Sequence, residues 1–380
     1  MNNISNENQI ESLELHKKLN GKLRTSLTGE VNKDTLKKFY TPGVGYVSSQ
    51  VSNGLISLNE VSWRKNLVAV ISDGSAVLGL GDIGPEGAMP VMEGKSMLFK
   101  RFAGIDSVPI VLNVHTVEEI VNTVMAISPS FGGINLEDIS APKCFEIEKL
   151  LIEKLNIPVM HDDQHGTAVV VLAGLINALK VVNKNINEIK IVILGAGAAG
   201  FAVANLIYYY SKTNIVSVDS KGIISNTRND LNNEKKILSG FNKDQISGSL
   251  QDALKGADVV IGLSKADALN GSDIKLMNKN QIVFALANPT PEIMPEEALN
   301  AGAVVVATGR SDFPNQINNV LAFPGIFKGA LLNNITKITT EHKIKSAETL
   351  ANLVLNVSPN QIVPDIFDDR IVPEISKIIK

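Results

Sequence analysis

The chain has 380 residues, 44% of them hydrophobic, and its 36 basic and 39 acidic residues give a net charge of −3. This length predicts about two or three domains with a full hydrophobic core. No basic stripe stands out along the sequence, so we expect no nucleic-acid partner. The single cysteine, Cys144, excludes an internal disulfide, which is typical of proteins from a reducing compartment.

Targeting signals are not expected in this sequence. The N-terminal residues lack the apolar core of a signal peptide. The longest apolar run, near residues 167–179, is shorter than the roughly 20 residues of a membrane span. We therefore expect a cytoplasmic protein with no membrane contact.

The first part of the chain is predicted to form a parallel sheet. Residues 1–60 have a helical and polar pattern, with a glycine-containing break at 40–45. The strands and helices expected next are strands 67–72, 108–114, 133–136 and 157–160, and helices 86–102, 117–127 and 142–155. Because these strands are apolar throughout and separated by helices, they favour a parallel sheet covered on both faces.

A long helix over 167–182 leads to a second βαβ series. It comprises strands at 190–194, 215–218, 259–263, 282–286 and 304–307, with a helix at 198–210. Residues 221–249 are expected to be irregular, and the tail from residue 340 to form an amphipathic helix. The predicted fold class is α/β with two lobes: domain 1–158, domain 159–319, and helices at 320–380 that return to the first domain.

Two acidic pairs follow predicted strands. Glu137 and Asp138 end the apolar run 131–136, and Asp162 and Asp163 come just after the run 157–160. Because an unpaired buried carboxylate costs many kcal/mol, four of them require a cation or a ligand. Oxygen ligands select a hard divalent ion such as Mg²⁺ or Mn²⁺. The alternative is that these acids only cap the helices that follow.

A glycine-rich turn follows the strand at 190–194 and matches the dinucleotide-binding pattern G-x-G-x-x-G. Its residues are Gly195, Ala196, Gly197, Ala198, Ala199 and Gly200. The three glycines are predicted to allow a tight turn, approach to a pyrophosphate, and close helix packing, respectively. The second lobe is therefore predicted to be a Rossmann-type, doubly wound domain that binds a nicotinamide dinucleotide. A sharp turn without a ligand is the alternative.

The residues that follow the predicted strand 215–218 bear on whether the cofactor is NAD or NADP. Asp219 ends that strand, where an acid binds ribose hydroxyls and repels a 2′-phosphate. Ser220 and Lys221 could instead bind the 2′-phosphate. NAD is the predicted cofactor, with NADP as the alternative. A second G-x-G-x-x-G at 79–84 follows a turn rather than a strand, and is interpreted as an active-site loop.

Several strings in a consistent order and spacing make the chain resemble the malic enzymes, of the short bacterial kind, over roughly residues 38–333. The strings are at residues 39–44, 79–84, 93–95, 136–139, 161–167, 195–200, 286–290, 318–320 and 323–325. The resemblance implies oxidation of malate at C2 with NAD(P), decarboxylation to pyruvate and CO₂, and a required divalent metal. It also implies that the N-terminal domain binds malate and the metal, and that the protein is a homodimer or homotetramer.

Site residues follow from the same resemblance. The implied metal ligands are Glu137, Asp138 and Asp163, with Asp162 beside them, bonded to a lysine or a metal-bound water. Lys95 matches the general base and Tyr40 the general acid. Both side chains titrate near 10, so we expect neighbouring positive charge, from the metal and from Lys95, to lower both pKa values. Without the resemblance, Tyr40 would be interpreted as a loop anchor and Lys95 as an exposed helix residue.

The resemblance further places Asn288 and Asn319 on the substrate and the nicotinamide, although an Asn before Pro is also common in turns. His161 and His165 are not expected to bind the metal. Ala76 departs from the pattern, because larger members carry an Arg there that binds a malate carboxylate. Either another group holds that carboxylate or the substrate preference differs. Two alternative functions remain: a malolactic enzyme, which keeps its cofactor and releases lactate, and a non-catalytic nucleotide-binding protein.

Overall fold

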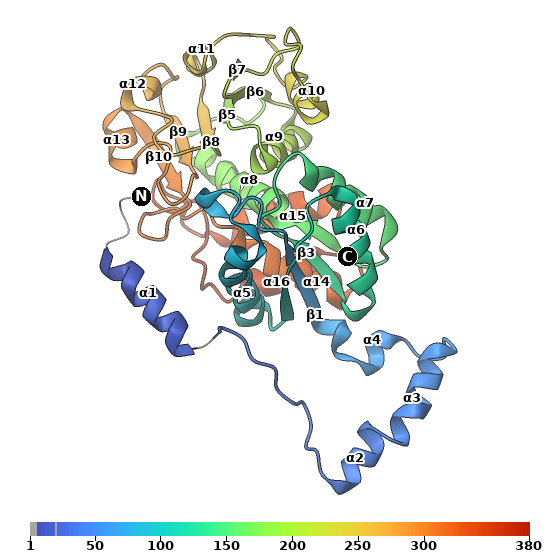
Figure 1. Cartoon of the computed structure of the whole chain (residues 1–380). Coiled ribbons are helices and arrows are strands. Elements are labelled where there is room, and N and C mark those ends of the chain that lie inside the picture. Colours follow the sequence, from blue (N-terminus) through green and yellow to red (C-terminus); the bar gives the residue numbers. More distant parts are fainter. Residues whose placement is uncertain (1–5, 20) are drawn as a thin grey trace.

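A computed structural model describes residues 6–19 and 21–380 of the chain. It confirms the α/β class, with two separate sheets (Figure 1). The helical prediction for residues 1–60 is confirmed at 6–19, 33–39, 43–52 and 58–61, whereas residues 21–32 are not helical, and residues 1–5 and 20 lie outside the described part. The elements there are α1 (Asn6–Leu19), α2 (Lys33–Phe39), α3 (Gly43–Ser52), α4 (Leu58–Val61) and the 3₁₀ turn η1 (Trp63–Asn66).

The first sheet is parallel and has the order β2-β1-β3-β4. Its strands are β1 (Leu67–Ser72), β2 (Asp106–Val111), β3 (Gly133–Leu136) and β4 (Val159–His161). Because β1 is buried on both faces, its alternate residues join two cores. Val68 and Val70 face α5 (Gly84–Ala103), whereas Ala69 and Ile71 face α6 (Val117–Ile127) and α7 (Lys143–Lys154).

The second sheet has the order β10-β9-β8-β5-β6-β7 and is parallel except for β7, which is antiparallel to β6. Its strands are β5 (Lys190–Leu194), β6 (Asn214–Asp219), β7 (Gly222–Ile223), β8 (Val259–Gly262), β9 (Gln281–Ala285) and β10 (Ala303–Thr308). The helices of this lobe are α9 (Ala198–Ser211), α10 (Asn233–Ser239), α11 (Leu250–Leu254), α12 (Gly271–Ile274) and α13 (Pro295–Asn300). The strand order, with β8 and β6 on either side of β5, confirms the doubly wound prediction.

One segment of this lobe was predicted wrongly. Residues 221–249 were expected to be irregular, but they contain β7 and α10. Gly222, with φ +106°, allows the tight reversal into β7, and the Asn232 side chain caps α10 by accepting from the Lys235 N–H. Such short elements depend on single turn and cap residues rather than on hydrophobic periodicity.

The helix α8 (Asp162–Val182) connects the two lobes and begins five residues earlier than predicted. By length and composition it could cross a membrane, which corrects the expectation that no apolar segment is long enough. However, 72% of its apolar stretch is buried inside the protein, and it packs against α9 and α15 (Thr340–Leu353). Its apolar composition is therefore accounted for by the protein core.

The C-terminal helices contact both lobes. In α14 (Phe323–Leu332), Phe323 and Phe327 pack edge-on against Phe99 of α5, with ring centroids 4.7 and 5.3 Å apart. The last helix, α16 (Ile371–Ile378), packs on α14, whereas α15 packs on α8. The domain limits stay a prediction, although β4 pairs with β3 and so continues the first sheet beyond residue 158.

Candidate active site

Two neighbouring strands bring the acidic pairs together. In the pairing of β3 with β4, Leu136 lies opposite His161, so the residues that follow each strand meet at one edge of the sheet. Glu137, Asp138 and Asp163 each place one carboxylate oxygen within 4.8 Å of the other two. The backbone N–H of Asp138 donates to Asp163 Oδ2 at 2.7 Å. The sequence prediction that these acids share one edge is therefore matched by the geometry.

The electrostatics of this cluster favour a cation. Burial raises the pKa of Glu137, raises that of Asp162 to about 7, and raises that of Asp163 to about 6. Lys95 opposes each of these shifts, but a single ammonium cannot balance the four carboxylates. A hard divalent ion suits a buried site of three carboxylate oxygens, so Glu137, Asp138 and Asp163 fit the predicted metal.

Lys95 lies at the centre of the site. This residue of α5 is 7% exposed, and its Nζ lies 2.6 Å from Asp162 Oδ2 and 2.8 Å from Glu137 Oε1. It also donates to Asn319 Oδ1 at 3.5 Å and lies 4.4 Å from the centre of the Phe323 ring. The structure therefore places Lys95, Asp162 and Asn319 together.

The chain's own residues shift the pKa of Lys95 upward. Burial disfavours the ammonium, but the Asp162 and Glu137 carboxylates outweigh burial and raise the pKa of Lys95 above its ordinary value. The lowered pKa that we expected depends on the positive charge of a metal, whereas the charged neighbours of Lys95 among the described residues are carboxylates. Lys95 is therefore a cation in this arrangement.

Two residues that shape the site were missed by the sequence analysis. A Cβ at Gly166, in the first turns of α8, would lie 1.9 Å from Asp162 Oδ1 and 3.0 Å from Asn319 Cβ. Gly166 thus lets Asp162 and Asn319 approach each other. Phe323 supplies the ring beside Lys95. Both residues lie in strings that carry the resemblance, 161–167 and 323–325, but neither was assigned a role in the site.

The nearby histidines both contact Glu148, and His161 Nδ1 also lies 3.7 Å from Asp163 Oδ2. His165 Nε2 lies 2.9 Å from Glu148 Oε2, and the backbone N–H of His161 donates to Glu148 Oε1 at 2.7 Å. Burial lowers the pKa of both histidines, which favours their neutral form. Glu148, on α7, thus helps to hold the start of α8 in place.

The glycine turn of the second lobe lies between β5 and α9. Gly195 has φ +112°, and a Cβ there would lie 2.3 Å from the Leu263 carbonyl oxygen. A Cβ at Gly200 would lie 2.0 Å from the Gly195 carbonyl oxygen. A Cβ at Gly197 would meet no atom within 4 Å. The chain's own packing therefore requires Gly195 and Gly200, whereas Gly197 leaves open space where a ligand's phosphates can approach.

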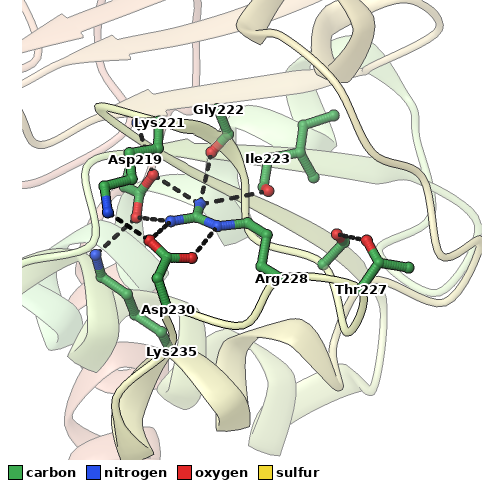
Figure 2. Close-up of polar contacts among 9 residues, drawn as sticks. Asp219, Lys221, Gly222, Ile223, Thr227, Arg228, Asp230 and Lys235 are labelled. Atoms are coloured by element: carbon green, nitrogen blue, oxygen red, sulfur yellow. Dashed lines mark hydrogen bonds and ion pairs between the residues drawn. The ribbon is translucent and has the colours of Figure 1, made fainter.

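Asp219 is held by two cations that the sequence analysis missed (Figure 2). Arg228 binds it with both terminal nitrogens, at 2.8 Å to Oδ1 and 3.0 Å to Oδ2, and Lys235 Nζ lies 2.6 Å from Oδ2. Burial raises the pKa of Asp219, but its bonds with Arg228 and Lys235 outweigh burial and lower that pKa to about 2. Arg228 and Lys235 escaped notice because their segment was predicted to be irregular.

Lys221 and Ser220, the predicted alternative partners of a 2′-phosphate, are arranged differently from Arg228 and Lys235. Lys221 directs its ammonium to Asp230 Oδ2 at 2.7 Å, while its backbone N–H donates to Asp219 Oδ1. Ser220 is exposed. Arg228 also binds Asp230, so three cations surround two carboxylates at this position (Figure 2).

The loop at 79–84 touches the second lobe. A Cβ at Gly79 would lie 2.3 Å from the Asn288 carbonyl oxygen, and one at Gly309 would lie 2.8 Å from Asn288 Nδ2. Asn288 is exposed but lies against the Gly79 loop and Gly309, near the ends of β9 and β10. The loop contains the 3₁₀ turn η2 (Leu78–Leu80) rather than a strand-turn-helix unit, which agrees with its interpretation as a site loop.

Tyr40 does not lie with these residues. It follows α2, is 67% exposed, and belongs to a segment that extends away from the body that carries α5 (Figure 1). Ala76, where the predicted carboxylate-binding Arg is missing, donates through its backbone N–H to the Asp138 carbonyl at 3.0 Å. The backbone at Ala76 thus lies beside the carboxylate cluster.

Together, a Rossmann-type lobe and a lysine-carboxylate cluster at the neighbouring sheet edge define a dinucleotide-dependent enzyme. Two family models match the chain: "Malic enzyme, N-terminal domain" over residues 17–152 and "Malic enzyme, NAD binding domain" over residues 164–379. The protein belongs to the malic enzyme family, and it is an NAD(P)-dependent enzyme of that family.

Relatives agree over nearly the full chain. The chain is 50% identical to the bifunctional malic/malolactic enzyme of Bacillus subtilis, covering 97% of this chain and 91% of the relative. It is 49% identical to the NAD-dependent malic enzyme of Geobacillus stearothermophilus, covering 95% of this chain and 76% of the relative. The crystal structure of the NAD-dependent malic enzyme from Thermotoga maritima is similar to this structure, with a TM-score of 0.94 and 48% sequence identity. The match covers 97% of this chain and 98% of that chain.

The glycine turn generates a paired prediction. Gly197→Val should leave the thermal unfolding midpoint near that of the unsubstituted protein but weaken NADH binding by about tenfold or more, because the side chain enters open space. Gly200→Val should lower both the midpoint and binding, because its side chain meets the Gly195 carbonyl. Fluorescence titration with NADH and thermal unfolding by circular dichroism measure the two effects. Unchanged NADH affinity in Gly197→Val would contradict the assigned position of the pyrophosphate.

Proposed function

We propose that the protein catalyses oxidative decarboxylation of (S)-malate to pyruvate and CO₂, with reduction of NAD or NADP and with a divalent metal. The observation that carries this proposal is the buried Lys95, which contacts Asp162 and Glu137 beside the three-carboxylate cluster. Such a cluster gives one site both a proton acceptor and a place for a Lewis acid.

Lys95 is the proposed base. It accepts the proton of the malate C2 hydroxyl while the hydride leaves C2 for the nicotinamide, and it must be neutral at that moment. Asp162, Glu137 and Asp163 all raise its pKa in the described arrangement. Glu137 and Asp163 would be neutralised by a bound divalent cation. Their neutralisation would remove two of these interactions and lower the pKa of Lys95 toward the range of a working base.

The proposed metal ligands are Glu137, Asp138 and Asp163. When bound, a divalent cation supplies the positive charge that polarises the C2 oxygen and stabilises the enolate left by the loss of CO₂. Asn319, bonded to Lys95, and Asn288, exposed beside the Gly79 loop, are the proposed substrate and nicotinamide contacts. Asp162 orients Lys95 through their 2.6 Å ion pair.

The proton balance requires one further group. The enolate carbon C3 takes a proton from the proposed acid Tyr40, and Lys95 then returns to Tyr40 the proton that it took from the hydroxyl. A Tyr40 proton thus ends on the methyl group of pyruvate, the malate hydroxyl proton replaces it on Tyr40, and the hydride ends on the cofactor. No net proton is released by the enzyme in this sequence of steps.

Release of lactate is the second candidate function. The Bacillus subtilis relative is named a bifunctional malic/malolactic enzyme, so this chain could also reduce the keto acid before its cofactor leaves. The two reactions share Lys95 and the metal site, and differ in whether the reduced cofactor accumulates.

An assay with malate, Mn²⁺ and either NAD or NADP tests the main proposal. We expect pyruvate and reduced cofactor in equal amounts, and a loss of about 10²–10⁴-fold in kcat for Lys95→Ala. The exposed Lys100→Ala, one turn further along α5, is the matched control and should retain activity. Consumption of malate with lactate as the product and no net reduced cofactor would support the malolactic reaction instead. Unchanged turnover in Lys95→Ala would refute the mechanism.

The metal site has its own test. Asp163→Ala should lose high-affinity Mn²⁺ binding in calorimetric titration of the protein alone, together with the Mn²⁺ dependence of turnover. The cause is the loss of one of three ligands and of its charge. Asp244→Ala, an exposed acid of the second lobe, should bind Mn²⁺ normally. Full activity of Asp163→Ala in excess chelator would be incompatible with the assigned ligands.

We also propose that both cofactors are used, NAD through Asp219 and NADP through Arg228 and Lys235. Arg228 and Lys235 offset the charge of Asp219, which weakens its repulsion of a 2′-phosphate. Arg228 and Lys235 lie next to Asp219, the proposed ribose-binding residue, and a 2′-phosphate is attached to that same ribose. The planar guanidinium of Arg can donate two parallel hydrogen bonds to a phosphate. NAD stays the predicted main cofactor, but Arg228 and Lys235, which were not identified from the sequence, favour the use of NADP as well.

Substituting Arg228 tests this assignment. Arg228→Gln should lower kcat/KM for NADP by about tenfold or more while changing that for NAD less, because a charge-assisted hydrogen bond to phosphate is lost. Lys221→Gln removes a neighbouring positive charge directed at Asp230 and should have a smaller effect. Equal losses with both cofactors in Arg228→Gln would show that Arg228 only supports the loop.

A further inference from the structure

Arg310 follows β10 and lies beside the turn that carries Asn288. Its Nη1 donates to the Pro289 carbonyl at 3.3 Å, and its backbone N–H donates to Thr308 Oγ1 at 3.2 Å. The preceding residue, Gly309, is so close to Asn288 that a Cβ on it would lie 2.8 Å from Asn288 Nδ2. The Arg310 side chain is 17% exposed. This guanidinium is therefore fixed next to a residue that we proposed as a contact of the substrate and the nicotinamide.

The first lobe touches the same turn but brings no positive charge to it. A Cβ at Gly79 would lie 2.3 Å from the Asn288 carbonyl oxygen and 3.2 Å from Pro289 Cδ. The loop that contains Gly79, residues 73–84, has no lysine or arginine. Where the two lobes meet at this turn, Arg310 of the second lobe therefore supplies the positive charge.

A dicarboxylate substrate requires a cation besides Lys95 and the proposed metal. The cluster at the ends of β3 and β4 has four carboxylates, and Lys95 contacts two of them, Glu137 and Asp162. One divalent ion together with the single ammonium leaves these groups with an excess of negative charge before a substrate enters. Malate adds two further negative charges. A substrate carboxylate at such a site needs a positive partner of its own.

Lys143, the first residue of α7, is a competing candidate, but its contacts exclude it. Its Nζ pairs with the carboxylate of Asp73, whose side chain is fully buried, and donates to the His115 carbonyl at 3.3 Å. Moving Lys143 to a substrate would leave a buried carboxylate unpaired, which is strongly destabilising. Arg310 instead pairs with Asp312, whose side chain is 55% exposed and therefore stays hydrated.

The Arg310 guanidinium has donors that no described residue uses. Of its five N–H donors, Nε and Nη2 each give one to Asp312, at 2.8 and 2.6 Å, and Nη1 gives one to the Pro289 carbonyl. Within residues 6–19 and 21–380, one donor thus remains on each terminal nitrogen. Both terminal nitrogens lie on one edge of the planar group, where a carboxylate can accept two parallel hydrogen bonds. Arg310 can therefore bind a second carboxylate while it keeps Asp312.

We propose that Arg310 binds the C1 carboxylate of malate through its two terminal nitrogens. This proposal rests on the proposed function, which supplies the substrate. The C4 carboxylate is the one that leaves as CO₂, so a cation on it would stabilise the charge that decarboxylation must remove. The C1 carboxylate keeps its charge from malate to pyruvate. Arg310 would then be the group that holds a malate carboxylate in a chain that has Ala76.

The constant charge at C1 determines which kinetic constant should change. Arg310→Gln should raise KM for malate by about tenfold or more and leave kcat within about threefold, because the lost contact is equal in the ground state and the transition state. A residue that only supported the turn would instead disturb Asn288 and lower kcat as well. An unchanged KM, or a fall in kcat as large as the rise in KM, would overturn the proposal.

Binding without turnover separates this proposal from the proposed function. Calorimetry of the full-length protein saturated with Mn²⁺ and NADH measures (S)-malate affinity, since malate cannot pass a hydride to a reduced cofactor. Arg310→Gln should weaken malate binding by about tenfold or more and NADH binding by less than about twofold. An equal loss of NADH affinity would assign the guanidinium to the cofactor and refute the proposal. If malate binding depends on Arg310 but NAD yields no pyruvate, the proposed function fails and the carboxylate contact stands.

Titration with (S)-lactate distinguishes the two carboxylates of malate. Lactate keeps the C1 carboxylate and the C2 hydroxyl but lacks the C4 carboxylate. Arg310→Gln should therefore weaken lactate and malate by about the same factor. A lactate affinity that does not change, together with a loss of malate affinity, would place Arg310 on the C4 carboxylate and contradict the assignment.

Arg370 provides a matched control. Like Arg310, it donates from Nε and Nη2 to an aspartate two residues away, Asp368, and to a distant carbonyl, that of Leu353. Arg370→Gln should leave malate affinity unchanged. Arg310→Lys, which keeps the charge without the fork, should recover part of the affinity that Arg310→Gln loses. If Arg310→Lys binds malate no better than Arg310→Gln and both lower the thermal unfolding midpoint, Arg310 only supports the turn and the proposal fails.

Discussion

The site depends on one buried interaction, the contact of the Lys95 ammonium with the Asp162 and Glu137 carboxylates. It joins α5 to the ends of two strands and connects α8 to the first sheet. A single cation among four carboxylates leaves an excess of negative charge, which is tolerable only if a second cation shares it. The metal site and the reactivity of Lys95 are thus two consequences of the same charge imbalance.

The parallel sheets determine where this interaction occurs. The pairing of Leu136 with His161 places both acidic pairs at one edge, and α8 begins there and runs into the second lobe. The Gly79 loop then approaches Asn288 at the ends of β9 and β10. Substrate chemistry and dinucleotide binding are adjacent because both lie at the carboxyl ends of parallel strands, where open α/β sheets bind ligands.

Much of this could be predicted from local patterns. The strands at 67–72, 133–136 and 190–194 were located to the residue, because a wholly buried parallel strand is a short apolar run between turns. Gly195 and Gly200 were recognised because a tight turn tolerates no side chain. Arg228 escaped prediction because a cation's partner is set by tertiary proximity, and its loop has no periodic pattern.

The sequence by itself determined the α/β class, the order of the two lobes, the glycine turn and the residue types of the site. These follow from hydrophobic periodicity and from steric rules that act over a few residues. Only the tertiary structure decided that carboxylates raise the pKa of Lys95, that two cations offset Asp219, and that Tyr40 is exposed. Each of these depends on distances that the fold sets, between distant residues such as Lys95 and Asp162 and across the loop from Asp219 to Arg228, and electrostatic energies and burial are functions of those distances.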